Sequence, residues 1–238
     1  MTALHKTIIS ACDPAPEWIS GHTEDKQPSQ FPHIALLPLA FVGQEYADGH
    51  LMGIALAIPK SIESRERGMA LRGLLYDENG LAKAVALRLG NLGVWTLTRE
   101  TRPTPPLTLH PKTWTKRSNV WASVTPIVLD RHPKSDYVKD RSGWTMEVTE
   151  IIALSCVRQG LPEPISIDVD TTSWHRGAPR AVSGKSAGFP IMPVKNGQPS
   201  RQQVHAWLQF SQPVEGPLLL GAGRYRGYGF CRPWKESR

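Results

Sequence analysis

The segment 216–233 near the C-terminus carries residue types that contact phosphates and nucleobases. Glycines let a backbone come close to a ligand, and their N–H groups can face phosphate oxygens. Arginines add positive charge, while tyrosines offer rings that stack on bases. The residues expected to bind are Gly221, Gly223, Arg224, Tyr225, Arg226, Gly227 and Gly229. The alternative is a glycine-rich turn that only packs.

This segment does not match two common phosphate-binding fingerprints. Gly223 and Gly227 are separated by three residues rather than two, and Pro233 follows where a dinucleotide-binding motif needs a helix. No Gly-Lys-Ser or Gly-Lys-Thr follows the spacer that a P-loop requires. Both of these nucleotide-binding motifs are therefore excluded.

The formal charge of +7 is concentrated in the last quarter of the chain. Residues 171–235 hold nine basic residues and one acidic residue, whereas the rest of the chain holds 19 basic and 20 acidic residues. The same region carries eight aromatic residues, which a merely solvated basic tail seldom has. Clustered positive charge binds polyanions by releasing counterions, so nucleic acid is the expected partner. Arg176, Arg180 and Lys185 are further expected contacts.

Three histidines in the first part of the chain are candidates for proton transfer, because imidazole titrates near neutral pH. His22 follows Gly21 in a polar loop and is the first choice, since a loop histidine reaches a substrate without disturbing a core. His33 stands at the start of an expected strand, and His50 ends the Ala47-Asp48-Gly49 turn. Structural roles are expected for His110, His132, His175 and His205.

The sequence lacks the residue patterns of several other kinds of site. The acidic and histidine side chains of residues 22–50 do not show a metal-ligand spacing, and no Gly-x-Ser-x-Gly elbow is present. Cys12, Cys156 and Cys231 are odd in number and widely spaced, which argues for buried thiols rather than disulfides or zinc ligands. The sequence therefore predicts neither a metal nor a cofactor.

The first half of the chain alternates strand and helix patterns. Apolar runs at 34–42 and 51–58 predict strands, and helix-forming residues extend from Ser61 to 77–80. Residues 82–98 predict two strands around the turn 90–93. Three prolines within 102–106 predict a linker.

The second half repeats this alternation. Strands are expected at 120–129, 165–169 and 204–210, and a helix at 146–158. Each half thus offers strands around one clear helix. The predicted fold is α+β, with two ferredoxin-like βαββαβ units side by side and a C-terminal glycine-rich loop. The expected domains are residues 1–110 and residues 111–238.

Length and hydropathy narrow the class of protein. A chain of 238 residues with 40% hydrophobic residues has room for one large core or two small ones. Its most continuous apolar run, 51–58, is far shorter than the ~20 residues that cross a bilayer. The N-terminus shows no basic region followed by a long apolar stretch. We expect a cytoplasmic protein without a membrane partner.

Several motifs together resemble one family. Residues 221–233 read Gly-Ala-Gly-Arg-Tyr-Arg-Gly-Tyr-Gly-Phe-Cys-Arg-Pro, which resembles the glycine-rich signature of the RAMP superfamily of RRM-like proteins that process CRISPR repeat RNA. Further matching motifs are Ser20-Gly21-His22, Pro32-His33-Ile34-Ala35, Leu37-Pro38-Leu39, Phe41-Val42-Gly43, residues 47–53, Trp121 with residues 124–131, and Gly160-Leu161-Pro162. From about Trp18 to Pro233, the chain resembles the processing half of the fused subunit of type I-G (formerly I-U) CRISPR effector complexes.

The resemblance implies a metal-independent endoribonuclease that matures CRISPR RNA. The 2′-OH beside the scissile phosphate attacks phosphorus and leaves a 2′,3′-cyclic phosphate and a 5′-hydroxyl, with His22, His33 and His50 as catalytic candidates. The crRNA then stays bound in the effector complex, together with backbone and large subunits. The implied partners also include a crRNA handle-binding subunit or half, and in the family's longer chains the handle-binding half precedes this one.

Two other functions stay open at this point. One is a catalytically inactive crRNA-binding subunit of the effector complex, which would share the glycine-rich loop and lack a working proton donor. The other is a ferredoxin-like enzyme or assembly protein unrelated to nucleic acid, whose basic loop contacts an acidic partner. A weak dependence of RNA affinity on salt would favour the latter.

Overall fold

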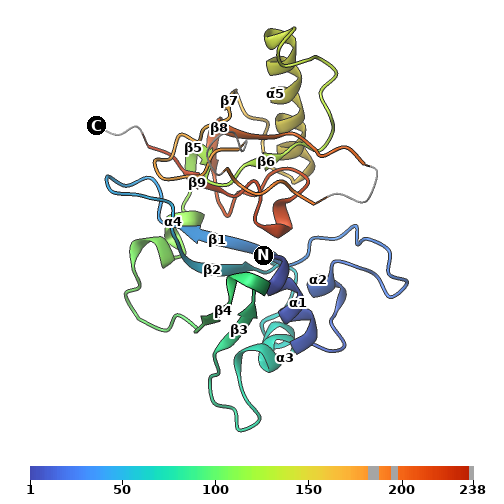
Figure 1. Cartoon of the computed structure of the whole chain (residues 1–238), viewed down its shortest axis with the longest axis vertical. Coiled ribbons are helices and arrows are strands. Elements are labelled where there is room, and N and C mark those ends of the chain that lie inside the picture. Colours follow the sequence, from blue (N-terminus) through green and yellow to red (C-terminus); the bar gives the residue numbers. More distant parts are fainter. Residues whose placement is uncertain (182–187, 194–197, 236–238) are drawn as a thin grey trace. The chain divides into compact units, whose positions relative to one another are not determined.

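The computed structural model describes residues 1–181, 188–193 and 198–235 (Figure 1). The chain forms two compact units. The first contains Met1–Pro38 and Gly53–Pro105, and the second contains Leu39–Met52 and Pro106–Arg238. The chain therefore passes from one unit to the other three times.

The first unit contains three helices and two separate two-stranded sheets. The helices are α1 (Thr2–Ala11), α2 (Glu17–Ser20) and α3 (Ser64–Leu75). One sheet pairs β1 (Ala35–Ala40) with β2 (Leu51–Ala57), and the residues between them, 41–50, belong to the second unit. The other sheet pairs β3 (Val85–Arg88) with β4 (Val94–Leu97) across the 3-10 helix η1 (Gly90–Leu92).

Apolar side chains at helical spacing hold α1 against α3. Leu4 and Ile8 lie four residues apart on α1 and are buried in one cluster with Leu71 and Leu74 of α3. Residues 2–11 thus form a helix whose apolar positions follow a helical period.

The second unit contains an antiparallel sheet in the order β9, β5, β8, β7. Its strands are β5 (Ser118–Ser123), β6 (Ile127–Val128), β7 (Ser166–Asp170), β8 (Gln203–Val214) and β9 (Cys231–Pro233). β6 continues along β8 after a break at Thr125 and Pro126. The connections contain three short helices, η2 (Leu107–Leu109), α4 (Lys112–Thr115) and η3 (Arg224–Arg226).

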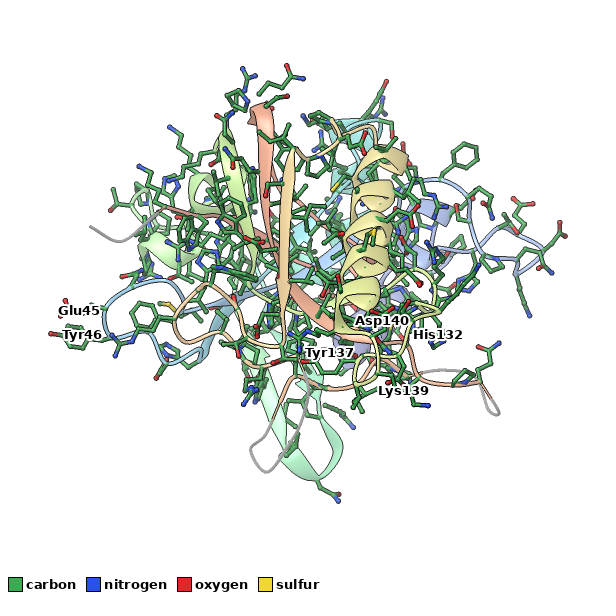
Figure 2. The ribbon with its side chains drawn as sticks, turned by 90° about the horizontal axis from the view of Figure 1, so that it is seen from above. Glu45, Tyr46, His132, Tyr137, Lys139 and Asp140 are labelled. Carbon is green, nitrogen blue, oxygen red and sulfur yellow. The ribbon has the colours of Figure 1, made fainter. Side chains whose placement is uncertain are left out.

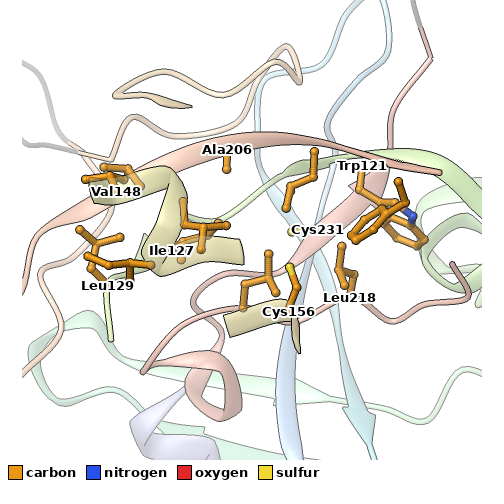
Figure 3. Close-up of a cluster of buried hydrophobic side chains, with 14 of the residues drawn as sticks. Trp121, Ile127, Leu129, Val148, Cys156, Ala206, Leu218 and Cys231 are labelled. Atoms are coloured by element: carbon orange, nitrogen blue, oxygen red, sulfur yellow. The ribbon is translucent and has the colours of Figure 1, made fainter. Parts of the chain in front are cut away.

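Helix α5 (Arg141–Arg158) covers this sheet (Figure 1). It begins five residues earlier than the sequence pattern predicts, because the side chain of Asp140 accepts a hydrogen bond from the N–H of Gly143 (2.9 Å) and caps the helix. Figure 2 shows Asp140 at this end of α5. Val148 and Ile152 of α5 pack into the core with Trp121 of β5 (Figure 3).

The α+β class is confirmed, and the second unit has the ferredoxin-like strand order. β8 lies between β5 and β7, which α5 connects, so these elements form a split β-α-β unit. In place of the second helix of that fold, the described residues of 215–230 form only the turn η3. The first unit departs from the prediction, since its described strands form two separate pairs rather than one four-stranded sheet.

The division into domains at residues 110 and 111 stays a prediction. None of the helices in the described part of the chain combines the length and the apolar character needed to cross a membrane.

Candidate functional site

The glycine-rich segment is built into the core of the second unit. The N–H of Gly221 donates to Ser155 Oγ (3.1 Å), and the N–H of Gly229 donates to the carbonyl of Pro126 (2.7 Å). A Cβ at Gly229, whose φ is +61°, would overlap the carbonyl oxygen of Leu220. The amides expected to face phosphate oxygens at these two glycines are therefore already used inside the protein.

The side chains of residues 224–226 are also available to meet a ligand. Arg226 is exposed on η3, while Arg224 and Tyr225 are half-buried. The Arg224 guanidinium lies 4.6 Å from the centre of the Tyr225 ring, and its Nη1 donates to the carbonyl of Gly221 (3.2 Å). RNA binding by this segment stays a prediction.

His22 and His33 belong to the first unit and lie near one another there. A Cβ at Gly21 would lie 3.1 Å from the His33 ring, which places that ring against the residue before His22. His22 Nδ1 lies 3.0 Å from the carbonyl of Ser20, and His33 Nδ1 lies 3.3 Å from that of Phe31. Since carbonyls only accept, both neutral rings carry the lone pair on Nε2, as a base requires.

His50 belongs to the second unit and is paired with Asp48. The Asp48 carboxylate accepts hydrogen bonds from the His50 backbone N–H (3.0 Å) and from His50 Nδ1 (2.5 Å). The backbone and the imidazole hydrogen bonds both lower the pKa of Asp48 below its usual value. Asp48 thus fixes the Nδ1–H tautomer, and the exposed ring presents Nε2 for proton transfer. This is how an orienting carboxylate serves a catalytic histidine.

The loop 41–50 that carries this pair packs on the basic segment 175–177. The N–H of Gly43 donates to the carbonyl of Arg176 (2.9 Å). A Cβ at Gly49, whose φ is +81°, would overlap the carbonyl oxygen of Gly177. The residues beside His50 and beside Arg176 are therefore in direct contact, although over 120 residues separate them. Figure 2 shows Glu45 and Tyr46 pointing outward at the tip of this loop.

The other predicted contacts are placed as follows. Arg176 is exposed and lines a cavity of the second unit. Arg180 is exposed, and its Nη2 donates to Thr171 Oγ1 (3.3 Å). Lys185 lies outside the described residues. Arg176 is thus a cation that the structure brings next to the loop of His50, as is Arg232, whose Nη1 donates to the carbonyl of Val42.

Two histidines for which structural roles are expected lie inside the second unit. His175 is buried, and its Nε2 lies 3.4 Å from the carbonyl of Arg232. His205 is buried and donates from Nε2 to the carbonyl of Pro179 (2.8 Å). Burial, and after it the positive charge of Arg232, lowers the pKa of His175 to about 4. His175 is therefore neutral near pH 7 and positions β9 through the Arg232 backbone.

Acidification from pH 7 to pH 5 is expected to lower the free energy of unfolding by about 2 kcal/mol through His175. The pKa of His175 rises from about 4 in the folded chain to its usual 6.5 on unfolding. The unfolded chain takes up the proton first, so stability is complete above pH ~6.5 and is lost as the pH falls toward 4. Urea unfolding at both pH values measures this change. His175→Gln should show a smaller pH dependence, and an unchanged dependence would contradict the assignment.

The described residues hold no group of three or more His, Cys, Asp or Glu placed to bind a metal ion. Cys12, Cys156 and Cys231 are buried and unpaired, as the sequence predicts. Burial raises the pKa of Cys156 to about 12 and that of Cys231 well above its usual value. These thiols are therefore protonated and pack as small apolar groups.

Sequence reasoning missed the partner of His50. The Asp-Gly-His spacing of residues 48–50 was the available signal, since an aspartate often accepts from the backbone N–H two residues later. It also missed Lys116, which lines the same cavity as Arg176. No local pattern marks that lysine, because the fold brings it there from a different part of the chain.

Comparison with known proteins gives the chain a family. No curated protein and no solved structure matches it. One family model, described as CRISPR-associated protein, GSU0054 family (Cas_GSU0054), matches residues 3–233. This match includes both compact units, the Asp48–His50 pair and the glycine-rich segment. The chain therefore belongs to the GSU0054 family of CRISPR-associated proteins.

Proposed function

We propose that this CRISPR-associated chain matures CRISPR RNA by cleaving repeat stem-loops without a metal ion. The observation that carries the proposal is the exposed Asp48–His50 pair, whose loop packs on the segment of Arg176. A base that is oriented by a carboxylate and accompanied by a cation is what 2′-OH attack on a phosphodiester needs.

In the proposed step the attacking 2′-OH loses one proton and the leaving 5′-oxygen gains one. Neutral His50 takes the 2′-OH proton at Nε2, and the 2′-oxygen forms a bond to phosphorus. The bond from phosphorus to the 5′-oxygen breaks, and that oxygen takes up a proton from water. The products are a 2′,3′-cyclic phosphate and a 5′-hydroxyl. Arg176 stabilises the negative charge that builds on the phosphorane oxygens.

Binding of the product completes the proposal. The exposed Arg226 and the half-buried Arg224 add cationic contacts for RNA. The mature crRNA stays on the chain within a type I-G effector complex that includes backbone and large subunits and a handle-binding partner. In this setting the protein acts in the cytoplasm.

The test is cleavage of repeat RNA by the purified chain in EDTA. We expect a cut that leaves a 2′,3′-cyclic phosphate, and we expect a 2′-deoxy substitution at the cut to abolish cleavage while RNA binding persists. Cleavage that requires Mg²⁺ and survives the 2′-deoxy substitution would refute the mechanism. Tight binding without cleavage would identify the chain as the catalytically inactive crRNA-binding subunit.

A further inference from the structure

The second unit contains a cavity of about 650 Å³ whose wall is rich in positive charge. Its cationic side chains are Lys116, Arg176, Arg232 and Lys235, and its acidic side chain is Glu45. A volume of this size lies within the range of about 300–1,000 Å³ that small-ligand sites occupy. The proposed cleavage step uses only Arg176 of these cations, so the others need their own explanation.

Three of these cations lie close enough together to repel one another. Burial lowers the pKa of Lys116, and the positive charges of Lys235 and Arg232 lower it further. Burial also lowers the pKa of Arg232, whose Nη1 donates to the carbonyl of Val42. Among the described residues, no ion pair involves any of the three. Such a cluster is unfavourable in the free protein and becomes favourable when an anion binds.

Two indole rings line the same cavity. Trp174 and Trp234 are both half-buried. The Trp234 ring packs edge to face on Trp207, with ring centres 6.0 Å apart and planes at 84°, and its backbone N–H donates to the carbonyl of Val120 (3.0 Å). A half-buried indole held in this way is a platform on which a flat ring can stack.

We propose that this cavity binds one unpaired nucleotide of RNA, with its phosphate on Lys116, Arg232 and Lys235 and its base on Trp174 or Trp234. The proposal rests on the proposed function, because the RNA that it binds is the substrate or product named there. A phosphate supplies the anion that the cations need, and a base supplies the flat ring that the indoles fit.

The geometry favours a single strand over a duplex and over a protein partner. A base reaches an indole inside a cavity only when it is unpaired and unstacked from its neighbours. An acidic peptide would satisfy the three cations, but its carboxylates offer nothing flat to the indoles. An unpaired stretch that flanks a repeat stem-loop is therefore the expected ligand.

The test measures binding of the full chain to a short fluorescein-labelled oligouridine in EDTA. Its 2′-oxygens carry methyl groups, so 2′-OH attack is impossible and binding is read apart from cleavage. Replacing both exposed lysines, as Lys116→Gln with Lys235→Gln, should lower the affinity about tenfold or more and flatten its salt dependence. Trp234→Ala should lower the affinity about tenfold, since stacking on this ring is lost.

The control is Lys112→Gln, which removes an exposed lysine of α4 that does not line the cavity. It should change the affinity by less than about twofold. Because Trp234→Ala also loses packing on Trp207, the lysine pair decides the case if that variant does not fold. The proposal is overturned if the double lysine variant binds like the unaltered chain, if a blunt RNA duplex shows the same loss, or if polyglutamate displaces the oligouridine as well as RNA does.

The experiments distinguish failure of the cavity assignment from failure of the proposed cleavage function. A chain that binds oligouridine through these lysines but does not cut repeat RNA refutes cleavage and leaves the cavity assignment standing. A chain that cuts repeat RNA, while its double lysine variant binds oligouridine normally, refutes the cavity assignment alone.

Discussion

Replacing His50 with alanine is expected to lower the rate of repeat-RNA cleavage by about 10²- to 10⁴-fold. The loss follows because the Nε2 lone pair that Asp48 orients is the proposed base for the 2′-OH proton. RNA affinity should stay within about twofold, since the proposed role of His50 is proton transfer rather than phosphate binding. Single-turnover cleavage and binding to 2′-deoxy repeat RNA measure the two quantities separately.

His22→Ala and His33→Ala are the matched comparisons, because both histidines were sequence candidates and both present Nε2 in their neutral form. Asp48→Asn should lower cleavage less than His50→Ala, since it removes the orienting carboxylate and keeps the imidazole. Full activity in His50→Ala together with an inactive His22→Ala would show that the base lies in the first unit. It would refute the assignment of His50 as the base.

Replacing Gly229 with alanine is expected to destabilise the second unit by about 3 to 5 kcal/mol. The left-handed backbone at φ +61° strains any side chain, and the added Cβ would overlap the Leu220 carbonyl oxygen. Urea unfolding followed by tryptophan fluorescence measures the loss. The expected defect is in folding rather than in RNA contact, because the Gly229 amide already donates to Pro126.

Gly160 supplies a control for backbone strain alone. It has a similar φ of +75°, but a Cβ there would meet nothing within 4 Å. Gly160→Ala should therefore lose only about 1 to 2 kcal/mol. If Gly229→Ala were as stable as the unaltered chain yet bound RNA poorly, the glycine would be a ligand contact and the packing account would be wrong.

The sequence predicted those strands and turns whose residue pattern is visible within the segment itself. The alternation at 165–169 and 204–210 marks β7 and β8, although both faces of β8 are buried at its start, where His205 lies inside the second unit. The turn at 90–93 marks the β3–β4 pair, because its glycines are a local signal for a tight connection between two strands. The run at 120–129 was predicted as one strand, but Thr125 and Pro126 interrupt it and accept hydrogen bonds from Phe230 and Gly229.

The site depended on contacts that no local pattern encodes. The histidines could be selected by type, and Arg176 by the charge of its region. The contact of loop 41–50 with residues 175–177 could not be predicted, because it is fixed by two glycine approaches between distant segments. The internal hydrogen bonds of Gly221 and Gly229 could not be predicted for the same reason, since the acceptors of their amides lie far away in the sequence.

The second unit is formed by two separate stretches of the sequence, which limits the fragments in which it can be produced alone. A separately expressed piece that starts at Pro106 would lack residues 39–52. It would lose the Val42 carbonyl that accepts from Arg232 and the Gly43 amide that donates to Arg176, and the Asp48–His50 pair would be gone. Such a piece would expose the buried side of segment 175–177 to water. Fragments intended to isolate this unit must therefore carry the loop of the β1–β2 pair, by fusion or by circular permutation.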